Sequence, residues 1–185
     1  LMEKLHNHSG RPSVMVLRPA DAEETTAAWK MAMENIYTPT ALILSRQDVT
    51  SVPNTSAEGV KKGAYIVSQD ENPQVVMLAS GSEVSTLMAG AELLRAEGIR
   101  LQIVSVPSEA IFRQQSKEYQ AEVLPQGVTR FGLTAGLPCN LEGLVGEHST
   151  VWGLNSFGFS APYKVLDEKL GFTAQNVYDQ VKKLL

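Results

Sequence analysis

The sequence predicts an α/β protein built on open, mostly parallel sheets with helices on both faces. Short apolar runs rich in β-branched residues alternate with longer segments that have the 3.6-residue periodicity of helices. Such runs are typical of strands buried on both sides, which is the usual environment of a parallel strand. With 185 residues, the chain is long enough for one large domain or two small ones with a buried core.

A first strand–helix–strand unit is predicted near the start of the chain. Residues 13–17 form its first strand, and Asp21 is placed to cap the following helix, with Glu24 completing a capping box. Pro39 marks the end of the helix, because the residue before a proline avoids the α conformation. Residues 40–44 form the second strand. A single unit of this kind leaves sheet edges uncovered, so it predicts further neighbours.

Residues 49–62 are rich in Ser, Thr, Asn and Gly with little apolar periodicity, and we expect them to be an inter-domain linker. A second α/β piece covers residues 63–185, and alternating strands and helices again predict a mostly parallel sheet. Its expected strands are 64–67, 75–79, 101–106, 129–133 and, more weakly, 149–152, and its expected helices are 82–97, 116–124, 161–170 and 173–184.

Composition limits the class of protein. A formal charge of −4 without a clustered basic face disfavours a nucleic-acid partner. No apolar run approaches the roughly 20 residues that span a bilayer, so we expect no membrane partner. The single cysteine, Cys139, excludes an internal disulfide and suits the cytoplasm. The chain starts at Leu1 without signal-peptide features, and we expect it to be part of a longer protein.

One side chain stands out as a candidate for binding. Arg46 follows the second predicted strand, and open α/β sheets place ligand-binding groups at the carboxyl ends of their strands. Its planar guanidinium suits a phosphate group. The alternative is a structural arginine paired with a neighbouring carboxylate. Position and chemistry alone favour that structural role.

Other chemistry-bearing residues give weaker signals. Residues 79–83 (ASGSE) join a predicted strand to a helix and could hold an anion, but they lack the further glycines of a dinucleotide site. A tight turn with Ser82 as helix cap is therefore favoured. The histidines and the cysteine predict neither a catalytic set nor a metal site, since no suitable ligands lie at the right spacing: His6, His8, His148 and Cys139.

Several motifs together resemble those of bacterial transketolases. They occur in the family's order and spacing from about residue 14 to the end of the chain. Each motif is weak singly, because strand–loop–helix pieces are common, but the set is specific. The motifs are VLRPADAEE (16–24), PTALILSRQ (39–47), ASGSEV (79–84), VSVPS (104–108) and SFGFSAP (156–162).

The resemblance implies a three-domain enzyme of which this chain is one part. Residues 1–48 would be the end of the pyrimidine-binding domain, 49–62 a linker, and 63–185 the transketolase C-terminal domain. It also implies thiamine diphosphate with Mg²⁺ as cofactors and a homodimer. The implied reaction transfers a two-carbon ketol unit between ketose and aldose phosphates in the pentose phosphate pathway.

Only Arg46 matches a functional position of the family, the arginine that binds the terminal phosphate of the sugar substrate. The family's catalytic, cofactor-binding and metal-binding residues lie upstream of Leu1, so the resemblance implies no cofactor or metal in this chain and no activity alone. Thr134 and Phe159 depart from the family's pattern in the C-terminal domain. The alternatives are another thiamine-dependent enzyme, such as a deoxyxylulose-phosphate synthase or a dehydrogenase β subunit, and a non-catalytic binding or dimerisation module.

Overall fold

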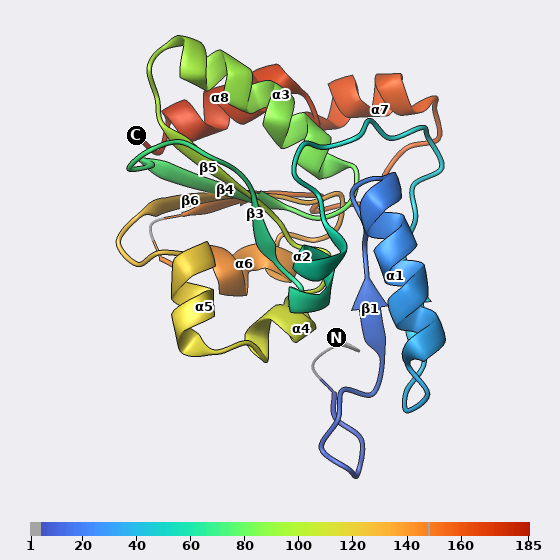
Figure 1. Cartoon of the computed structure of the whole chain (residues 1–185). Helices are drawn as coiled ribbons and strands as arrows, with labels where there is room; N and C mark the ends of the chain where they lie inside the picture. The colour runs from blue at the N-terminus through green and yellow to red at the C-terminus, as the bar shows by residue number, and fades with distance from the viewer. Residues whose placement is uncertain (1–4, 148) are drawn as a thin grey trace.

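The computed structural model describes residues 5–147 and 149–185. It confirms the predicted α/β class, with two parallel-sheet units that follow one another along the chain (Figure 1). The elements are β1 (Met15–Leu17), α1 (Ala22–Glu34), β2 (Thr40–Leu42), α2 (Ala57–Lys62), β3 (Tyr65–Gln69), β4 (Val75–Ala79), α3 (Glu83–Ala96), β5 (Leu101–Ser105), α4 (Glu109–Arg113), α5 (Lys117–Val123), β6 (Thr129–Leu133), α6 (Cys139–Val145), β7 (Thr150–Trp152), α7 (Tyr163–Leu170) and α8 (Ala174–Lys182).

The first unit pairs β1 with β2 in parallel and connects them through α1. Asp21 caps α1 as predicted, because its Oδ1 accepts the Glu24 N–H at 3.0 Å. The capping box is wrong in its second half: the Glu24 carboxylate accepts the N–H of Ala20, at 2.7 Å, and not that of Asp21. The helix also ends earlier than predicted, at Glu34, because Asn35 leaves the helix and donates its side-chain amide to residues beyond it.

The second unit is a five-stranded sheet in the order β3-β5-β4-β6-β7. All its neighbouring strands are parallel except β3, which pairs antiparallel with β5 at one edge. In Figure 1, α3 and α8 cover one face of the sheet, and α4, α5 and α6 cover the other. The mostly parallel sheet with helices on both faces is therefore confirmed.

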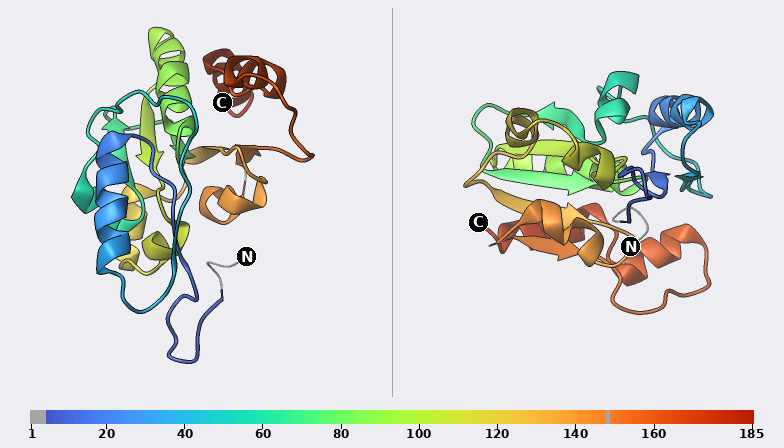
Figure 2. Two further views of the ribbon diagram at one scale, coloured as in Figure 1. Left: turned by 90° about the vertical axis from the view of Figure 1, so that its right-hand side faces the viewer. Right: turned by 90° about the horizontal axis from the view of Figure 1, so that it is seen from below.

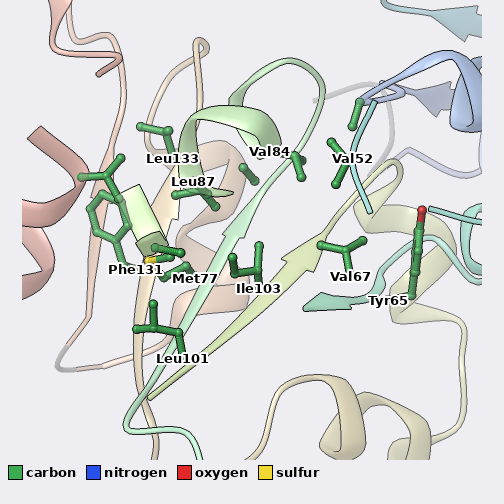
Figure 3. Packing of buried hydrophobic residues seen from close by; sticks show 14 of the residues in the cluster. Val52, Tyr65, Val67, Met77, Val84, Leu87, Leu101, Ile103, Phe131 and Leu133 are labelled. Carbon is green, nitrogen blue, oxygen red and sulfur yellow. The ribbon is translucent and has the colours of Figure 1, made fainter. Parts of the chain in front are cut away.

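Alternate residues of the central strand supply the two halves of the core. Met77 of β4 packs with α3 and α8 in one cluster, while Val76 and Leu78 pack in the other. Figure 3 shows Met77 beside Leu87, Leu101 and other members of the first cluster. Burial on both faces explains why β4 is an unbroken apolar run in the sequence.

Three short helices were not predicted: α2, α4 and α6, of five to seven residues each. Fewer than two turns carry too little periodicity to reveal a helix in the sequence. One of them, α2, lies inside the predicted linker 49–62, where Ser56 caps it and Gly63 ends it in the left-handed conformation at φ 82°. Val52 and Val60 of this segment are buried in the core.

The first unit lies at the carboxyl ends of β4 and β5. The N–H of Arg18, directly after β1, donates to the carbonyl of Pro107, two residues beyond β5, at 2.8 Å. The N–H of Gly81, two residues beyond β4, donates in turn to the carbonyl of Arg18 at 3.1 Å. The two views in Figure 2 show the first unit against one end of the larger sheet. That end is where parallel α/β sheets bind ligands.

Arg130 joins two helix ends on the opposite side of the second unit. Its guanidinium donates to the carbonyl of Leu144, in the last turn of α6, at 2.7 Å, and to those of Leu124 and Pro125, at the end of α5, at 2.9 and 3.0 Å. Carbonyls at helix ends have no partner within the helix, and they carry partial negative charge. The half-buried Arg130 supplies both the donors and the opposite charge.

We predict that Arg130→Met lowers the free energy of unfolding by about 2–4 kcal/mol, because three carbonyls lose charge-assisted hydrogen bonds. Urea unfolding of the chain measures this change. Arg100→Met is the control, since Arg100 is exposed and bonds only at the surface, and it should change stability by less than about 0.5 kcal/mol. Equal effects of the two substitutions would contradict the role given to Arg130.

Candidate functional site

A cavity of about 540 Å³ opens between the two units, beside the carboxyl end of β2. Residues 43–50, the loop that follows β2, form its wall on the first unit and include Arg46. The N-terminal turn of α3 and one side of α7 form the opposite wall, with Phe159 at the rim. The strand end predicted to bind a ligand therefore lies at a cavity.

Arg46 is exposed in this cavity. Among residues 5–147 and 149–185, its side chain makes no ion pair and no hydrogen bond. The structural ion pair considered from the sequence is therefore not observed in that range. The side chain has its full set of donors available, and a guanidinium can offer two parallel N–H groups to a phosphate or carboxylate.

A second arginine, Arg18, lines the same cavity but is fully engaged. Its guanidinium donates to the carbonyl and, at 3.1 Å, to the hydroxyl of Ser80, and it pairs with the carboxylate of Glu83 at 3.0 Å. Glu83 begins α3, and the backbone of Arg18 bonds to the second unit through both its N–H and its carbonyl. Arg18 thus fixes the first unit to the start of α3.

The turn between β4 and α3 is shaped around Arg18. Gly81 has φ +67°, and a Cβ at this position would lie 2.8 Å from the Arg18 Cζ. The sequence analysis considered an anion bound at this turn. The guanidinium of Arg18 occupies that place instead. The tight turn is confirmed, but the cap is wrong: the Ser82 side chain makes no capping hydrogen bond, and the Ser82 carbonyl instead accepts the Ser85 hydroxyl at 2.8 Å.

A buried carboxylate forms the second contact between the units. Glu24 of α1 accepts hydrogen bonds from the hydroxyl of Tyr65, on β3, at 2.7 Å and from the hydroxyl of Ser105, on β5, at 2.6 Å. It also accepts the backbone N–H of Ala20. Burial raises the pKa of the Glu24 carboxyl, and the hydrogen bonds only partly oppose it. Burial and the neighbouring Glu24 likewise raise the pKa of the Tyr65 phenol.

Asp21 connects the same helix to the predicted linker. Its Oδ2 accepts the N–H of Val52 at 3.0 Å and the hydroxyl of Thr55 at 2.8 Å, while its Oδ1 caps α1. One carboxylate thus serves the start of the helix and the chain that leaves the first unit. The segment from Val52 to Thr55 is fixed in place by these bonds.

Among the described residues that line the cavity, Arg46 is the cation that stands open to a ligand. Asp48, Glu83 and Asp167 also line the cavity, and Glu83 is neutralised by Arg18. Burial and the nearby Glu83 raise the pKa of the Asp167 carboxyl above its ordinary value. An anionic ligand is therefore attracted at Arg46 and disfavoured near Asp48.

Within the part of the chain that the structure describes, no group of three or more His, Cys, Asp and Glu side chains could hold a metal ion. His148 lies outside the described residues, and Cys139 is exposed on α6. None of the described helices is long and apolar enough to cross a membrane.

Comparison with known proteins identifies the family. Residues 63–173 match the model of the transketolase-like C-terminal domain. The chain belongs to the transketolase family. It is 43% identical to the transketolase of Geobacillus stearothermophilus over its whole length and covers 28% of that protein. It is 38% identical to the chloroplastic transketolase of Craterostigma plantagineum, of which it covers 36%.

Solved transketolases share the fold. A transketolase from Leishmania mexicana superposes on 94% of the chain with a TM-score of 0.88 at 39% identity, and the match covers 25% of that protein. A split-gene transketolase, described as an inactive β4 tetramer, covers the whole chain with a TM-score of 0.79 at 26% identity, and the match covers 60% of that protein. The resemblance inferred from the motifs is confirmed, and the chain matches the C-terminal part of the transketolase sequences.

We predict a pH-dependent contribution of Glu24 to stability. Because its pKa is raised in the folded chain, the folded state keeps a proton that the unfolded state releases. Its contribution is therefore fully present below the ordinary carboxyl pKa and is lost as pH rises through the raised value. Unfolding of wild type and Glu24→Gln should be compared from about pH 4 to pH 8.

The difference in unfolding free energy, wild type minus Glu24→Gln, should decrease as the pH rises across this range. Tyr163→Phe, which removes the hydroxyl of an exposed side chain, is a control for general pH effects. A difference for Glu24→Gln that stays constant would show that the carboxyl has its ordinary pKa, and one that increases with pH would show a lowered pKa; either result would contradict the prediction.

Proposed function

We propose that this chain forms the C-terminal part of a transketolase, in which Arg46 binds the terminal phosphate of the sugar substrates. The enzyme would transfer a two-carbon ketol unit between ketose and aldose phosphates of the pentose phosphate pathway. The observation that carries this proposal is the guanidinium of Arg46, which pairs with none of the residues that the structure describes and lies in a cavity beside β2, in a chain of the transketolase family.

Arg46 would act by binding and orientation. Its guanidinium can hold a phosphate through two parallel hydrogen bonds, and the reacting carbonyl lies several bonds away from that phosphate. Binding energy gained at a remote group helps to fix the position of the reacting carbon. Arg46 transfers no proton, because a guanidinium stays protonated throughout the pH range of enzymes.

Thiamine diphosphate and Mg²⁺ would be bound by parts of the enzyme outside this chain. The described residues contain no group of side chains that could hold the metal ion, and we assign no step at the cofactor to residues of this chain. Its contribution to the reaction is the phosphate anchor and the surface that carries it.

The exposed apolar surface of the first unit indicates that other parts of the enzyme pack against this chain. Met33 and Ile36, in and after the last turn of α1, are 78% and 80% exposed, and Trp29 and Tyr37 are also largely exposed. A two-stranded parallel sheet is seldom stable with its faces open, and an apolar patch of this kind marks a contact surface. We infer that the remaining transketolase sequence covers it within a homodimer, which suits a cytoplasmic enzyme.

A non-catalytic assembly module is the second candidate. It is favoured by the split-gene relative, whose structure is described as an inactive β4 tetramer. Another thiamine-dependent reaction has less support, because the relatives named above are transketolases. Ketol transfer by the complete enzyme separates these alternatives.

In the complete enzyme, we predict that Arg46→Ala raises KM for ribose 5-phosphate and for xylulose 5-phosphate roughly 10- to 150-fold. This change corresponds to the loss of one charge-assisted hydrogen bond of about 1.5–3 kcal/mol. Steady-state kinetics with thiamine diphosphate and Mg²⁺ present measure the change. The kcat should change much less.

Two variants accompany that experiment. Arg46→Lys keeps the charge but loses the planar pair of donors, so its KM should lie between those of wild type and Arg46→Ala. Arg100→Ala removes an exposed arginine elsewhere on the surface and should leave KM unchanged. Unchanged KM values in Arg46→Ala would remove Arg46 from the substrate site.

For the isolated chain, we predict no ketol transfer and no tight binding of thiamine diphosphate, because the described residues include no group of side chains that could hold the metal ion, and the family's cofactor-binding residues lie upstream of Leu1 in the resemblance. Calorimetric titration of the 185-residue chain with thiamine diphosphate and Mg²⁺, beside a transfer assay, measures both. Turnover by the purified chain, or saturable binding at micromolar concentration, would contradict this prediction.

A further inference from the structure

We propose that Arg18 is a positioning residue for the phosphate site: it holds the loop of Arg46 at a fixed distance from the second unit. This inference rests on the phosphate-binding role proposed for Arg46. It assigns a specific task to the ion pair of Arg18 and Glu83, which joins the two walls of the cavity.

Register places the two arginine-bearing loops side by side. Leu17, the last residue of β1, pairs with Leu42, the last residue of β2, and the N–H of Ile43 donates to the Leu17 carbonyl at 2.9 Å. Arg18 therefore leaves the sheet next to the start of the loop that carries Arg46. A displacement of Arg18 would be transmitted to that loop through the strand pair.

Arg18 is also the residue through which this strand pair is tied to the second unit. Its N–H and carbonyl bond to Pro107 and Gly81, and its guanidinium bonds to Ser80 and Glu83. The Arg18 side chain is 21% exposed and that of Glu83 is 6% exposed, so the pair is largely shielded from water. Shielded ion pairs are screened less by salt and hold a more defined geometry than exposed ones.

The cavity makes this tie relevant to substrate binding. One wall is the loop of Arg46 and the other is the start of α3 with α7, so its width depends on how the two units are joined. Glu83, the partner of Arg18, belongs to the second wall. Shifting a binding group by about 1 Å can cost on the order of 100-fold in rate, so a loosened tie would misplace Arg46 without removing it.

The contacts require a guanidinium at position 18. A carbonyl, a hydroxyl and a carboxylate are bound at once, which suits a planar fork with five N–H groups. A lysine could keep the ion pair with Glu83, but its compact ammonium cannot reproduce the same set of directed bonds. Arg18→Lys is therefore a conservative variant and Arg18→Gln a disruptive one.

The test compares acceptors with and without a phosphate in the complete enzyme. Steady-state KM and kcat are measured for ribose 5-phosphate and for glycolaldehyde, with wild type, Arg18→Lys and Arg18→Gln. We expect KM for ribose 5-phosphate to rise on the order of 10-fold in Arg18→Gln and less in Arg18→Lys. The KM for glycolaldehyde and both kcat values should stay within about twofold, because the chemistry is untouched.

Arg95→Gln is the matched control. Arg95 pairs with Asp70 at 3.0 Å, and their side chains are 24% and 28% exposed, but the pair lies wholly within the second unit. Breaking it should leave both KM values unchanged. Thermal unfolding of each variant identifies any that fails to fold, and if Arg18→Gln is one of these, Arg18→Lys decides the matter.

The inference is overturned if KM for ribose 5-phosphate is unchanged in the folded Arg18 variants. It is equally overturned if both acceptors are affected alike, since Arg18 would then serve only the general fold. A wild-type enzyme that transfers no ketol unit refutes the proposed function instead, and it does so before any variant is compared.

Discussion

The arrangement of this chain depends on the set of hydrogen bonds and the ion pair that Arg18 makes across the junction of the two units. The carboxyl ends of β4 and β5 meet the first unit there. Arg18 bonds through its backbone to the loop after each of these strands, and its side chain bonds to Ser80, after β4, and to Glu83, at the start of α3. A charged group removed from water is costly unless it is paired, so only one relative placement of the units satisfies it. The buried Glu24, bonded to Tyr65 and Ser105, imposes the same requirement from the other end of the junction.

The contacts at the junction explain how the loop after β2, which makes few polar contacts of its own, can hold Arg46, the proposed binding residue, in place. The first unit is small and largely apolar on its outer side, and it has little sheet of its own to hold the loop after β2. Arg18 and the pairing of β1 with β2 connect that loop to the larger unit and restrain its position. In the proposed function, residues from both units thus hold Arg46, the proposed phosphate-binding residue, in place.

Local sequence patterns were sufficient for the main elements of the fold. The predicted strands 75–79 and 129–133 match β4 and β6 residue for residue, because both are short β-rich runs ended by turn residues. The pattern also placed Arg46 after a strand, but the prediction of a buried strand over 40–44 was wrong: β2 ends at Leu42 and is half-buried, with Ile43 and Leu44 exposed. The role proposed for Arg46 came from the resemblance. Helix α2 was missed because six residues show too little periodicity.

Contacts between distant residues could not be predicted in this way. Arg18 and Glu83 are 65 positions apart, and Glu24 and Ser105 are 81 apart. Nothing in the local pattern around Glu24 distinguishes a carboxylate that completes a capping box from one that is buried against another unit. The one local hint of these contacts was the group of charged residues from Arg18 to Glu24, directly after the first predicted strand. Their role could be recognised only once the structure showed the junction between the two units.

Amide hydrogen exchange followed by NMR tests the role of this junction most directly. The N–H groups of Arg18 and Gly81 cross it, whereas that of Val106, bonded to the Ala79 carbonyl, lies within the second unit. If the junction holds the two units as one cooperative body, all three should exchange with the same opening free energy. Exchange of Arg18 and Gly81 that is orders of magnitude faster than that of Val106 would show that the units separate freely, and would contradict the account.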